Sequence, residues 1–248
     1  MLYHIIASGS KGNATIVKHK NTVILIDMGI SFSRLEEGLK EINLKAEDID
    51  FALFTHNHSD HINGLRFIPI RKQYALDGSL PSNGYNVLEL YQRYHLKDVD
   101  IIPIRTSHDA SNPCGFIIET AEEKLVYMTD TGIFLDECLS YVSNPTYLIL
   151  ECNHDLKMLY KSNRPLDLKT RIASDHGHLS NEDSALAAKD IVGPRTKEIT
   201  LAHISEECNT PELALEAYNR IFSFFHLDIS KYNIRVANQY VSLTGGKL

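Results

Sequence analysis

The 248-residue sequence lacks the features that mark membrane, secreted and disulfide-rich proteins. No apolar run approaches the roughly 20 residues that a membrane-spanning helix requires. The apolar start, residues 1–6, is too short for a secretory signal. Its four cysteines are scattered without a C-x-x-C pair, so reduced thiols are expected rather than a disulfide framework. These absences predict a cytoplasmic protein with no membrane anchor.

A basic excess is also absent, since 25 Lys and Arg face 32 Asp and Glu, for a formal net charge of −7. This balance weakens a nucleic-acid substrate without excluding it. Two bound divalent cations would add a charge of about +4 at the place where an anionic substrate reacts. Length and composition favour one globular domain over residues 1–248.

The common motifs of nucleophilic and nucleotide-binding enzymes are missing as well. There is no G-x-S-x-G elbow, and no cysteine lies in a catalytic signature. The segment Ser8–Asn13 lacks the spacing of a phosphate-binding P-loop. We expect this segment to be a tight loop whose backbone approaches a metal site.

Metal-ligating residues are instead concentrated between residues 55 and 65, which read THNHSDHINGL. The pattern H-x-H-x-D-H comprises His56, His58, Asp60 and His61. Imidazole and carboxylate groups are ligands for zinc, manganese or iron. The preceding apolar run, residues 50–55, predicts a buried strand that ends at this cluster. His56 and His58 can face one ion and Asp60 and His61 a second, so the pattern predicts two neighbouring metal ions.

The apolar pattern elsewhere predicts an α/β fold. Strands are predicted at residues 2–6, 15–17, 22–26, 99–104, 116–119, 124–128, 147–150 and 199–202. Helices are predicted from a capping box at Ser33 to residue 41, and at 61–72, 87–95, 180–191 and 210–224. Strands in groups separated by helices indicate two sheets packed together with helices outside.

Several polar residues lie at or just beyond the carboxyl ends of these strands: Asp27, His56, Asp130, Glu151 and His203. Ligands gather at strand ends in layered α/β folds, so these residues are expected to converge. Asp130 also has an alternative role, because it could cap a helix near residue 134. His178 could likewise cap the helix that follows it.

Taken together, the residues resemble the five motifs of the metallo-β-lactamase superfamily, in order: Asp27, residues 56–61, His108, Asp130 and His203. Segments 9–13, 107–110, 129–132, 151–155, 177–181 and 202–205 closely resemble the bacterial YycJ/WalJ family, whose members are regarded as DNA exonucleases. The resemblance implies a four-layer αββα metallo-β-lactamase sandwich and a nucleic acid substrate, expected to be DNA.

The resemblance also implies the ligand sets. A first metal would be held by His56, His58 and His108, a second by Asp60, His61 and His203, and Asp130 would bridge the two. Asp27 would orient the histidine cluster. Zinc suits the histidine-rich set, and manganese is compatible with it.

This arrangement suits phosphodiester hydrolysis, in which a hydroxide shared by two ions about 3.5–4 Å apart attacks phosphorus. Asp60 would orient the hydroxide, and His178 would donate a proton to the leaving oxygen, with Glu151 or His154 positioning it. Asp60 and His178 are therefore the predicted catalytic residues.

Two other functions remain open, a thioester or lactone hydrolase and a diiron redox module. The hydrolase would not need the loop of His178, and redox relatives usually carry a carboxylate where this chain has His58. Two nuclease subfamilies do not fit the spacing. The 22 residues from His108 to Asp130 leave no room for the arm of RNase Z, and the 73 from Asp130 to His203 are too few for a β-CASP domain.

Overall fold

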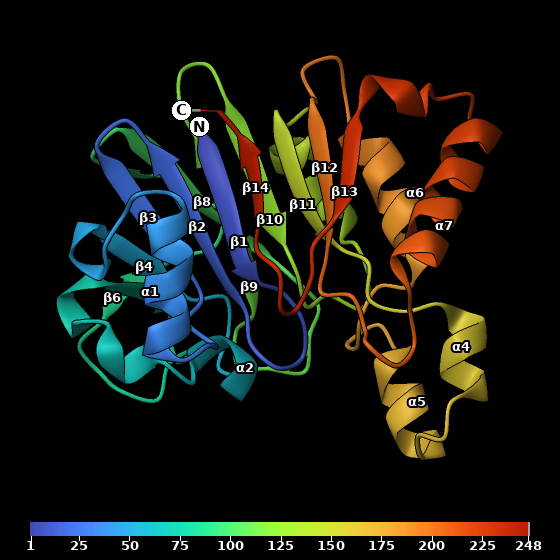
Figure 1. Cartoon of the computed structure of the whole chain (residues 1–248), viewed down its shortest axis with the longest axis horizontal. Helices are drawn as coiled ribbons and strands as arrows, with labels where there is room; N and C mark the ends of the chain where they lie inside the picture. Colours follow the sequence, from blue (N-terminus) through green and yellow to red (C-terminus); the bar gives the residue numbers. More distant parts are fainter. Residues whose placement is uncertain (248) are drawn as a thin grey trace.

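The computed structural model describes residues 1–247, whose strands form two seven-stranded sheets (Figure 1). The first has the order β14-β1-β2-β3-β4-β5-β6. Its strands are β1 (Leu2–Ala7), β2 (Ala14–His19), β3 (Thr22–Ile26), β4 (Phe51–Leu53), β5 (Gln73–Leu76), β6 (Asn86–Leu88) and β14 (Leu243–Gly246). The second has the order β13-β12-β11-β10-β9-β8-β7. Its strands are β7 (Tyr94–Leu96), β8 (Val99–Arg105), β9 (Cys114–Glu119), β10 (Lys124–Met128), β11 (Tyr147–Glu151), β12 (Glu198–Ala202) and β13 (Asn233–Val236).

Helices cover the outer faces of both sheets. The helices of the chain are α1 (Phe32–Glu41), α2 (Ser59–Ile62), α3 (Leu139–Val142), α4 (Leu156–Lys161), α5 (Leu166–Ile172), α6 (Asn181–Ile191) and α7 (Pro211–Phe224), of which α4 and α5 project beyond the sheets. Leu35 and Leu39 of α1 pack on the first sheet, and α6 and α7 pack on the second (Figure 1). These four layers confirm the predicted αββα sandwich. Within residues 1–247, no helix combines the length and apolarity that crossing a membrane requires.

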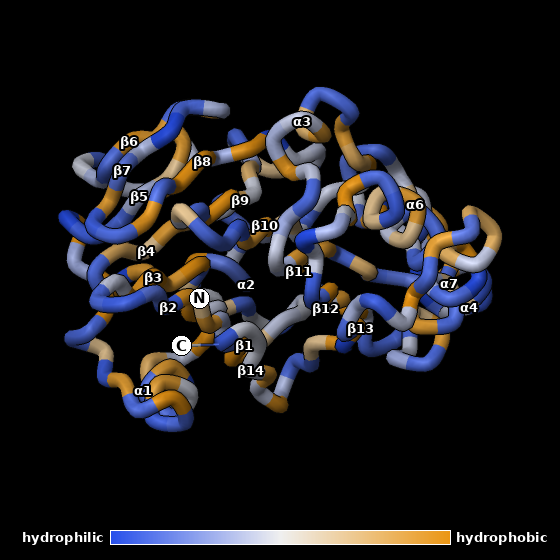
Figure 2. The backbone as a smooth tube through the Cα atoms, turned by 90° about the horizontal axis from the view of Figure 1, so that it is seen from above, coloured by the Kyte–Doolittle hydropathy of each residue, from blue (hydrophilic) through white to orange (hydrophobic). Residues whose placement is uncertain are grey.

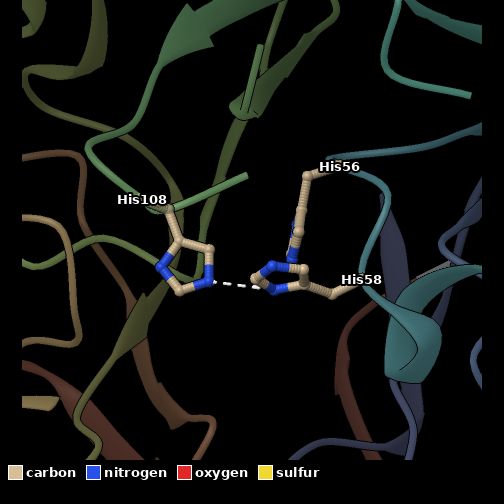
Figure 3. A group of neighbouring side chains, drawn as sticks. All are labelled: His56, His58 and His108. Atoms are coloured by element: carbon tan, nitrogen blue, oxygen red, sulfur yellow. Dashed lines mark hydrogen bonds between the residues drawn. The ribbon is translucent and has the colours of Figure 1, made fainter. Parts of the chain in front are cut away.

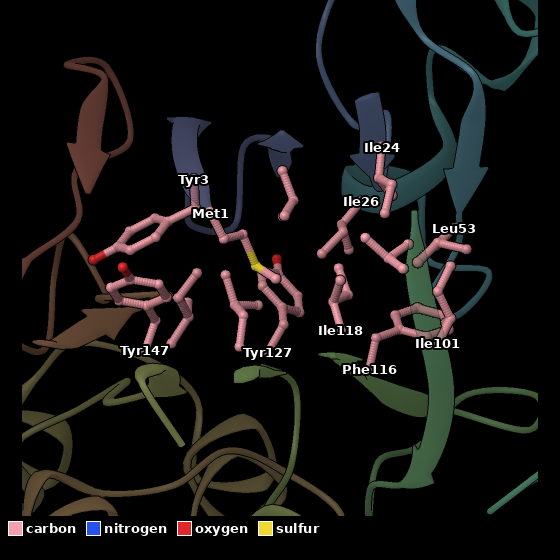
Figure 4. Close-up of a cluster of buried hydrophobic side chains, with 14 of the residues drawn as sticks. Met1, Tyr3, Ile24, Ile26, Leu53, Ile101, Phe116, Ile118, Tyr127 and Tyr147 are labelled. Carbon is pink, nitrogen blue, oxygen red and sulfur yellow. The ribbon is translucent and has the colours of Figure 1, made fainter. Parts of the chain in front are cut away.

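The core between the sheets is built by alternate residues of the strands, as the two-residue period of a strand requires. In β10, Leu125 and Tyr127 face the opposite sheet, whereas Val126 and Met128 face the helices. The residues between the sheets are drawn in Figure 4. Because these strands are buried on both faces, they read as continuous apolar runs. The strands are correspondingly hydrophobic in Figure 2, while many of the connecting loops are hydrophilic.

The site lies where the carboxyl ends of parallel strands meet. In the first sheet β3 pairs parallel with β4, and in the second β10, β11 and β12 pair parallel with one another. Parallel strands place their carboxyl ends at the same edge of a sheet. The residues that follow these strands therefore emerge together, as the strand-end pattern predicts.

The helices predicted at 180–191 and 210–224 agree with the structure, whereas those predicted at 61–72 and 87–95 do not. Ser180 caps α6, and Thr210 caps α7 with Pro211 in its first turn. Helix α1 is capped by Ser31 rather than Ser33, so the predicted capping box is wrong.

The helix predicted at 61–72 is wrong, because α2 ends at Ile62 and two 3₁₀ turns, Leu65–Phe67 and Ile70–Lys72, follow. Pro69 between these turns lacks the backbone N–H that a continuing helix needs. The helix predicted at 87–95 is also wrong, since Val87 pairs with Ala75 in one sheet and Tyr94 with Ile101 in the other.

Candidate metal centre

Three predicted site residues have left-handed backbone conformations directly after a strand. Asp27 follows β3 with φ of 59°, Asp130 lies just beyond β10 with φ of 56°, and His203 follows β12 with φ of 56°. This conformation is uncommon for residues other than glycine and costs on the order of 1 kcal/mol or more at each position. Three of the ten described non-glycine residues with positive φ therefore lie at the edge where the predicted ligands meet.

Three histidines form the first group of potential ligands, His56, His58 and His108 (Figure 3). Each offers a ring nitrogen, and these atoms lie within 4.8 Å of one another. His58 Nδ1 is 3.2 Å from His108 Nε2, the contact dashed in Figure 3. His56 and His58 follow β4, while His108 arrives from the loop after β8, so the two sheets contribute jointly.

The second group comprises Asp60, His61 and His203, again with ligand atoms within 4.8 Å of one another. Asp130 lies between the two groups. Its Oδ2 is 3.2 Å from His61 Nε2, and its Oδ1 is 3.7 Å from His108 Nε2. The structure thus brings together all seven residues predicted to ligate metal, and it places Asp130 where a bridging carboxylate is expected.

Unpaired polar atoms test whether metal ions fit here. Among the described residues, His56 Nε2, His203 Nε2 and Asp130 Oδ2 are buried without a hydrogen-bond partner. An unsatisfied buried polar group costs about 1–3 kcal/mol, so such groups are rare in native proteins. All three atoms belong to metal-ligating residue types. The donor set therefore fits bound divalent cations.

The other ring nitrogen of four of these histidines is held by the protein. The pairs are His56 Nδ1 with Thr55 Oγ1 (3.0 Å), His61 Nδ1 with Asp27 Oδ2 (2.8 Å), His108 Nδ1 with the Gly177 carbonyl (2.9 Å) and His203 Nδ1 with Glu151 Oε1 (3.0 Å). Such bonds select the tautomer that leaves Nε2 as the ligand atom. Asp27 binds His61 through this bond, which is the orienting position expected for it.

The pKa values of the site residues shift in both directions. Despite burial, Asp130 and Asp27 raise the pKa of His61 to about 10, and Asp130 holds the pKa of His203 well above its usual value. Burial, together with the neighbouring His61, holds the pKa of His56 well below its usual value, so this imidazole is neutral. Burial alone would raise the pKa of Asp130, but His203 and His61 hold it well below its usual value. A neutral imidazole and an ionised carboxylate are the forms that bind metals.

His178 lies beside the second group and is fixed by Glu151. Its Nδ1 donates to Glu151 Oε1 over 2.8 Å, and its side chain is 17% exposed. Among residues 1–247, no protein group forms a hydrogen bond with His178 Nε2, so this nitrogen is free to contact a substrate. His154 makes no such contact, because both of its ring nitrogens lack partners. Of the two residues proposed to position His178, the structure favours Glu151.

Two alternatives for these residues are excluded. Ser180, not His178, caps α6, since its hydroxyl accepts the N–H of Asp183. Asp130 caps no helix, because the first helical turn after it is a 3₁₀ turn at Asp136–Cys138 that has Leu135 as its N-cap.

Sequence reasoning missed two side chains at this centre. Asn13 donates its amide to the Gly9 carbonyl and lies 3.0 Å from His61 Nε2. The sequence predicts that the backbone of this loop approaches the metal site, but not that the Asn13 side chain does. Asp109 pairs with Arg171 and lies 3.5 Å from His108 Nε2. The signal in the sequence that could have indicated Asp109 is that it directly follows the predicted ligand His108.

The chain matches the family described as the beta-lactamase superfamily domain over residues 22–204. It belongs to the beta-lactamase superfamily. Among its relatives, exodeoxyribonuclease WalJ of Streptococcus pneumoniae serotype 2 is 36% identical over 229 residues, covering 86% of this chain and 84% of that protein. Exodeoxyribonuclease YycJ of Bacillus anthracis is 32% identical over 232 residues, covering 88% of each.

Solved structures of the superfamily share the fold at low sequence identity. The metallo-beta-lactamase fold protein YhfI of Bacillus subtilis superposes with a TM-score of 0.73 at 17% identity, over 98% of this chain and 99% of that one. Zinc-bound PqqB of Methylobacterium extorquens superposes with a TM-score of 0.69 at 12% identity, over 98% and 99%. These likenesses confirm the metallo-β-lactamase fold.

Proposed function

We propose that this protein is a two-metal phosphodiesterase that degrades DNA from an end. The observation that carries the proposal is Asp130, which lies between two groups of ligands that contain unpaired imidazole nitrogens. The relatives named exodeoxyribonucleases support DNA as the substrate, since they match 86–88% of the chain.

Each ligand group accounts for one ion. The first would be held by His56, His58 and His108, and the second by Asp60, His61 and His203, with Asp130 available to both. Bound divalent ions supply an activated water of lowered pKa and neutralise charge on the phosphate. Ligands that are all nitrogen and oxygen suit zinc and are compatible with manganese.

The chain's own groups then serve the reaction around these ions. The Asp60 carboxylate is 22% exposed, so it can accept a hydrogen bond from the attacking water. His178, held through Nδ1 by Glu151, can donate a proton from Nε2 to the leaving sugar oxygen. Asp60 and His178 are thus the proposed catalytic residues.

A local basic segment supports a polyanionic substrate despite the acidic chain. Helices α4 and α5 project beyond the sandwich in Figure 1. These helices and the loop between them carry five basic residues and one acidic residue over residues 156–171, and two of the five, Arg164 and Arg171, pair with Glu207 and Asp109. Lys157, Tyr160 and Lys161 share one face of α4, and Tyr160 is 59% exposed. Exposed cations beside an aromatic ring form the surface that single-stranded nucleic acids bind.

We further propose a single domain and a cytoplasmic location. All four cysteines are free and buried, as expected in a reducing compartment.

The test uses metal-loaded protein with end-labelled double-stranded DNA, single-stranded DNA and RNA. We expect a nucleotide-by-nucleotide ladder from DNA, and its loss when His56→Ala and His58→Ala are combined. The control is His95→Ala, an exposed histidine paired with Asp100. Undiminished cleavage by the double variant contradicts the metal mechanism. Cleavage of a thioester without any cleavage of nucleic acid would make the protein a small-molecule hydrolase.

A further inference from the structure

A groove opens beside the first group of ligands and shares only His108 with the proposed metal ligands. Its volume is about 490 Å³, and its walls include Leu76, Leu90, Arg105, His108, Leu135 and His176. His108 belongs both to this wall and to the proposed ligands, so a molecule in the groove lies next to the reacting phosphate. The volume falls within the range of about 300–1,000 Å³ that holds small organic ligands.

The walls combine apolar side chains with the Arg105 guanidinium, and they also include the acidic residues Asp136 and Glu137. Leu76, Leu90 and Leu135 offer surface for a sugar or a base. The Arg105 side chain is 57% exposed, and its nearest ion-pair partner, Glu137, is 3.9 Å away. This long contact leaves most of the guanidinium donors free, and guanidinium binds phosphate through paired hydrogen bonds.

Arg105 is also close to the metal centre along the chain. It ends β8, and His108 follows three residues later, at most about 10 Å of extended backbone away. The loop between them is held, since Ser107 Oγ lies 3.1 Å from His176 Nδ1 and the Asp109 N–H donates to the His176 carbonyl. The loop that joins Arg105 to His108 is therefore held in place close to the ligands.

We propose that this groove binds the nucleotide next to the scissile bond, with Arg105 on its phosphate and the leucines against its sugar and base. The inference rests on the proposed nuclease function and assigns its substrate subsite. Two other cavities fit less well. One is lined by residues of 62–82 and the other lies between α4, α6 and α7, and neither includes a proposed ligand.

The test measures binding of thymidine 5′-monophosphate, thymidine 3′-monophosphate and inorganic phosphate to the metal-loaded protein by calorimetry. In Arg105→Ala, the Kd of the tighter-binding isomer is expected to rise about tenfold, as loss of one charged hydrogen bond implies. The Kd of inorganic phosphate is expected to stay within twofold, because phosphate alone reaches the metals without the groove. Leu135→Trp, which fills the groove, is expected to weaken nucleotide binding as well.

Arg93→Ala is the matched control. Its side chain is 53% exposed and pairs with Asp100 and Glu119, near the opposite end of β8. Unchanged nucleotide binding in both groove variants would overturn the subsite, as would equal weakening of nucleotide and phosphate. Arg93→Ala should also hydrolyse methyl p-nitrophenyl phosphate, a diester that can react with the groove empty, within twofold of the parent rate. A parent protein that cleaves neither this diester nor DNA would instead contradict the proposed function.

Discussion

Replacing Glu151 by glutamine tests the part of the site that lies behind the ligands. The Glu151 side chain is fully buried and accepts four hydrogen bonds, from His178 Nδ1 (2.8 Å), His203 Nδ1 (3.0 Å), Thr131 N (2.8 Å) and Leu179 N (3.3 Å). Glutamine keeps one accepting oxygen and turns an NH₂ group toward neighbours that also donate. About two of the four bonds are therefore lost.

The magnitude follows from these bonds. Two hydrogen bonds to a charged group, at about 1.5 kcal/mol each, lower the free energy of unfolding by about 3 kcal/mol. Partners of metal-ligating histidines are worth about 10- to 100-fold in metal affinity or activity. We expect Glu151→Gln to lower kcat/KM for DNA by that factor, measured with saturating metal at a temperature where the variant is folded.

Glu198→Gln separates this effect from simple destabilisation. Glu198 begins β12, at the end opposite His203, and its Oε2 accepts from Tyr3, Arg235 and the Gly246 N–H. This control should lose stability and keep its activity. If Glu151→Gln retains as much activity as Glu198→Gln, Glu151 does not position the site.

A double-mutant cycle assigns the mechanism further. If Glu151 acts by holding His178, adding Glu151→Gln to His178→Ala should cost less activity than Glu151→Gln costs alone. The remaining cost should appear as weaker metal binding, because Glu151 also holds His203. Full additivity of the two activity losses, together with an unchanged metal affinity in Glu151→Gln, would refute a role through these two histidines.

Three further outcomes are expected. In Gly29→Ala, the new Cβ would lie 1.6 Å from the Asp60 carbonyl oxygen, so we expect a loss of about 3 kcal/mol or more in urea unfolding, and parental stability would contradict that packing. Combining Lys157→Glu with Lys161→Glu should raise the KM for DNA and lower the salt-dependence slope of binding by about 1.5–2, whereas an unchanged slope would place DNA elsewhere. Chelation should lower the Tm, because ions bind only the folded ligand set, and readdition of zinc or manganese should restore it, while an unaffected Tm would argue against a bound metal.

Elements with local signals were predictable from the sequence. Thr210 followed by Pro211 marks a helix start through capping alone, and β3 is bounded by residues that cannot extend it. The region 87–95 shows the opposite case. Its apolar spacing also suits a helix, but Val87 and Tyr94 belong to two short strands that pair with Ala75 and Ile101. Pairing with the neighbouring strands β5 and β8 outweighs such a weak local preference.

The ligands themselves were predictable because metal chemistry requires their residue types at short spacing. Their supports were harder to foresee, since these depend on contacts distant in sequence. Asn13 reaches His61, and Arg171 reaches Asp109, across 48 and 62 residues. A carboxylate or amide has many possible partners at such separations. Only the folded chain shows which one it meets.

The strained strand ends connect metal binding to folding of this edge. Asp27, Asp130 and His203 adopt φ values that glycine would accept more easily, but glycine has no atom to offer a metal or its ligands. The left-handed turn lets the chain leave the sheet while the side chain contacts other residues of the site. Strain and the unpaired nitrogens of His56 and His203 both disfavour this edge without ions. Ion binding satisfies those nitrogens, so the edge should gain more protection from hydrogen exchange on metal loading than the opposite ends of the same strands.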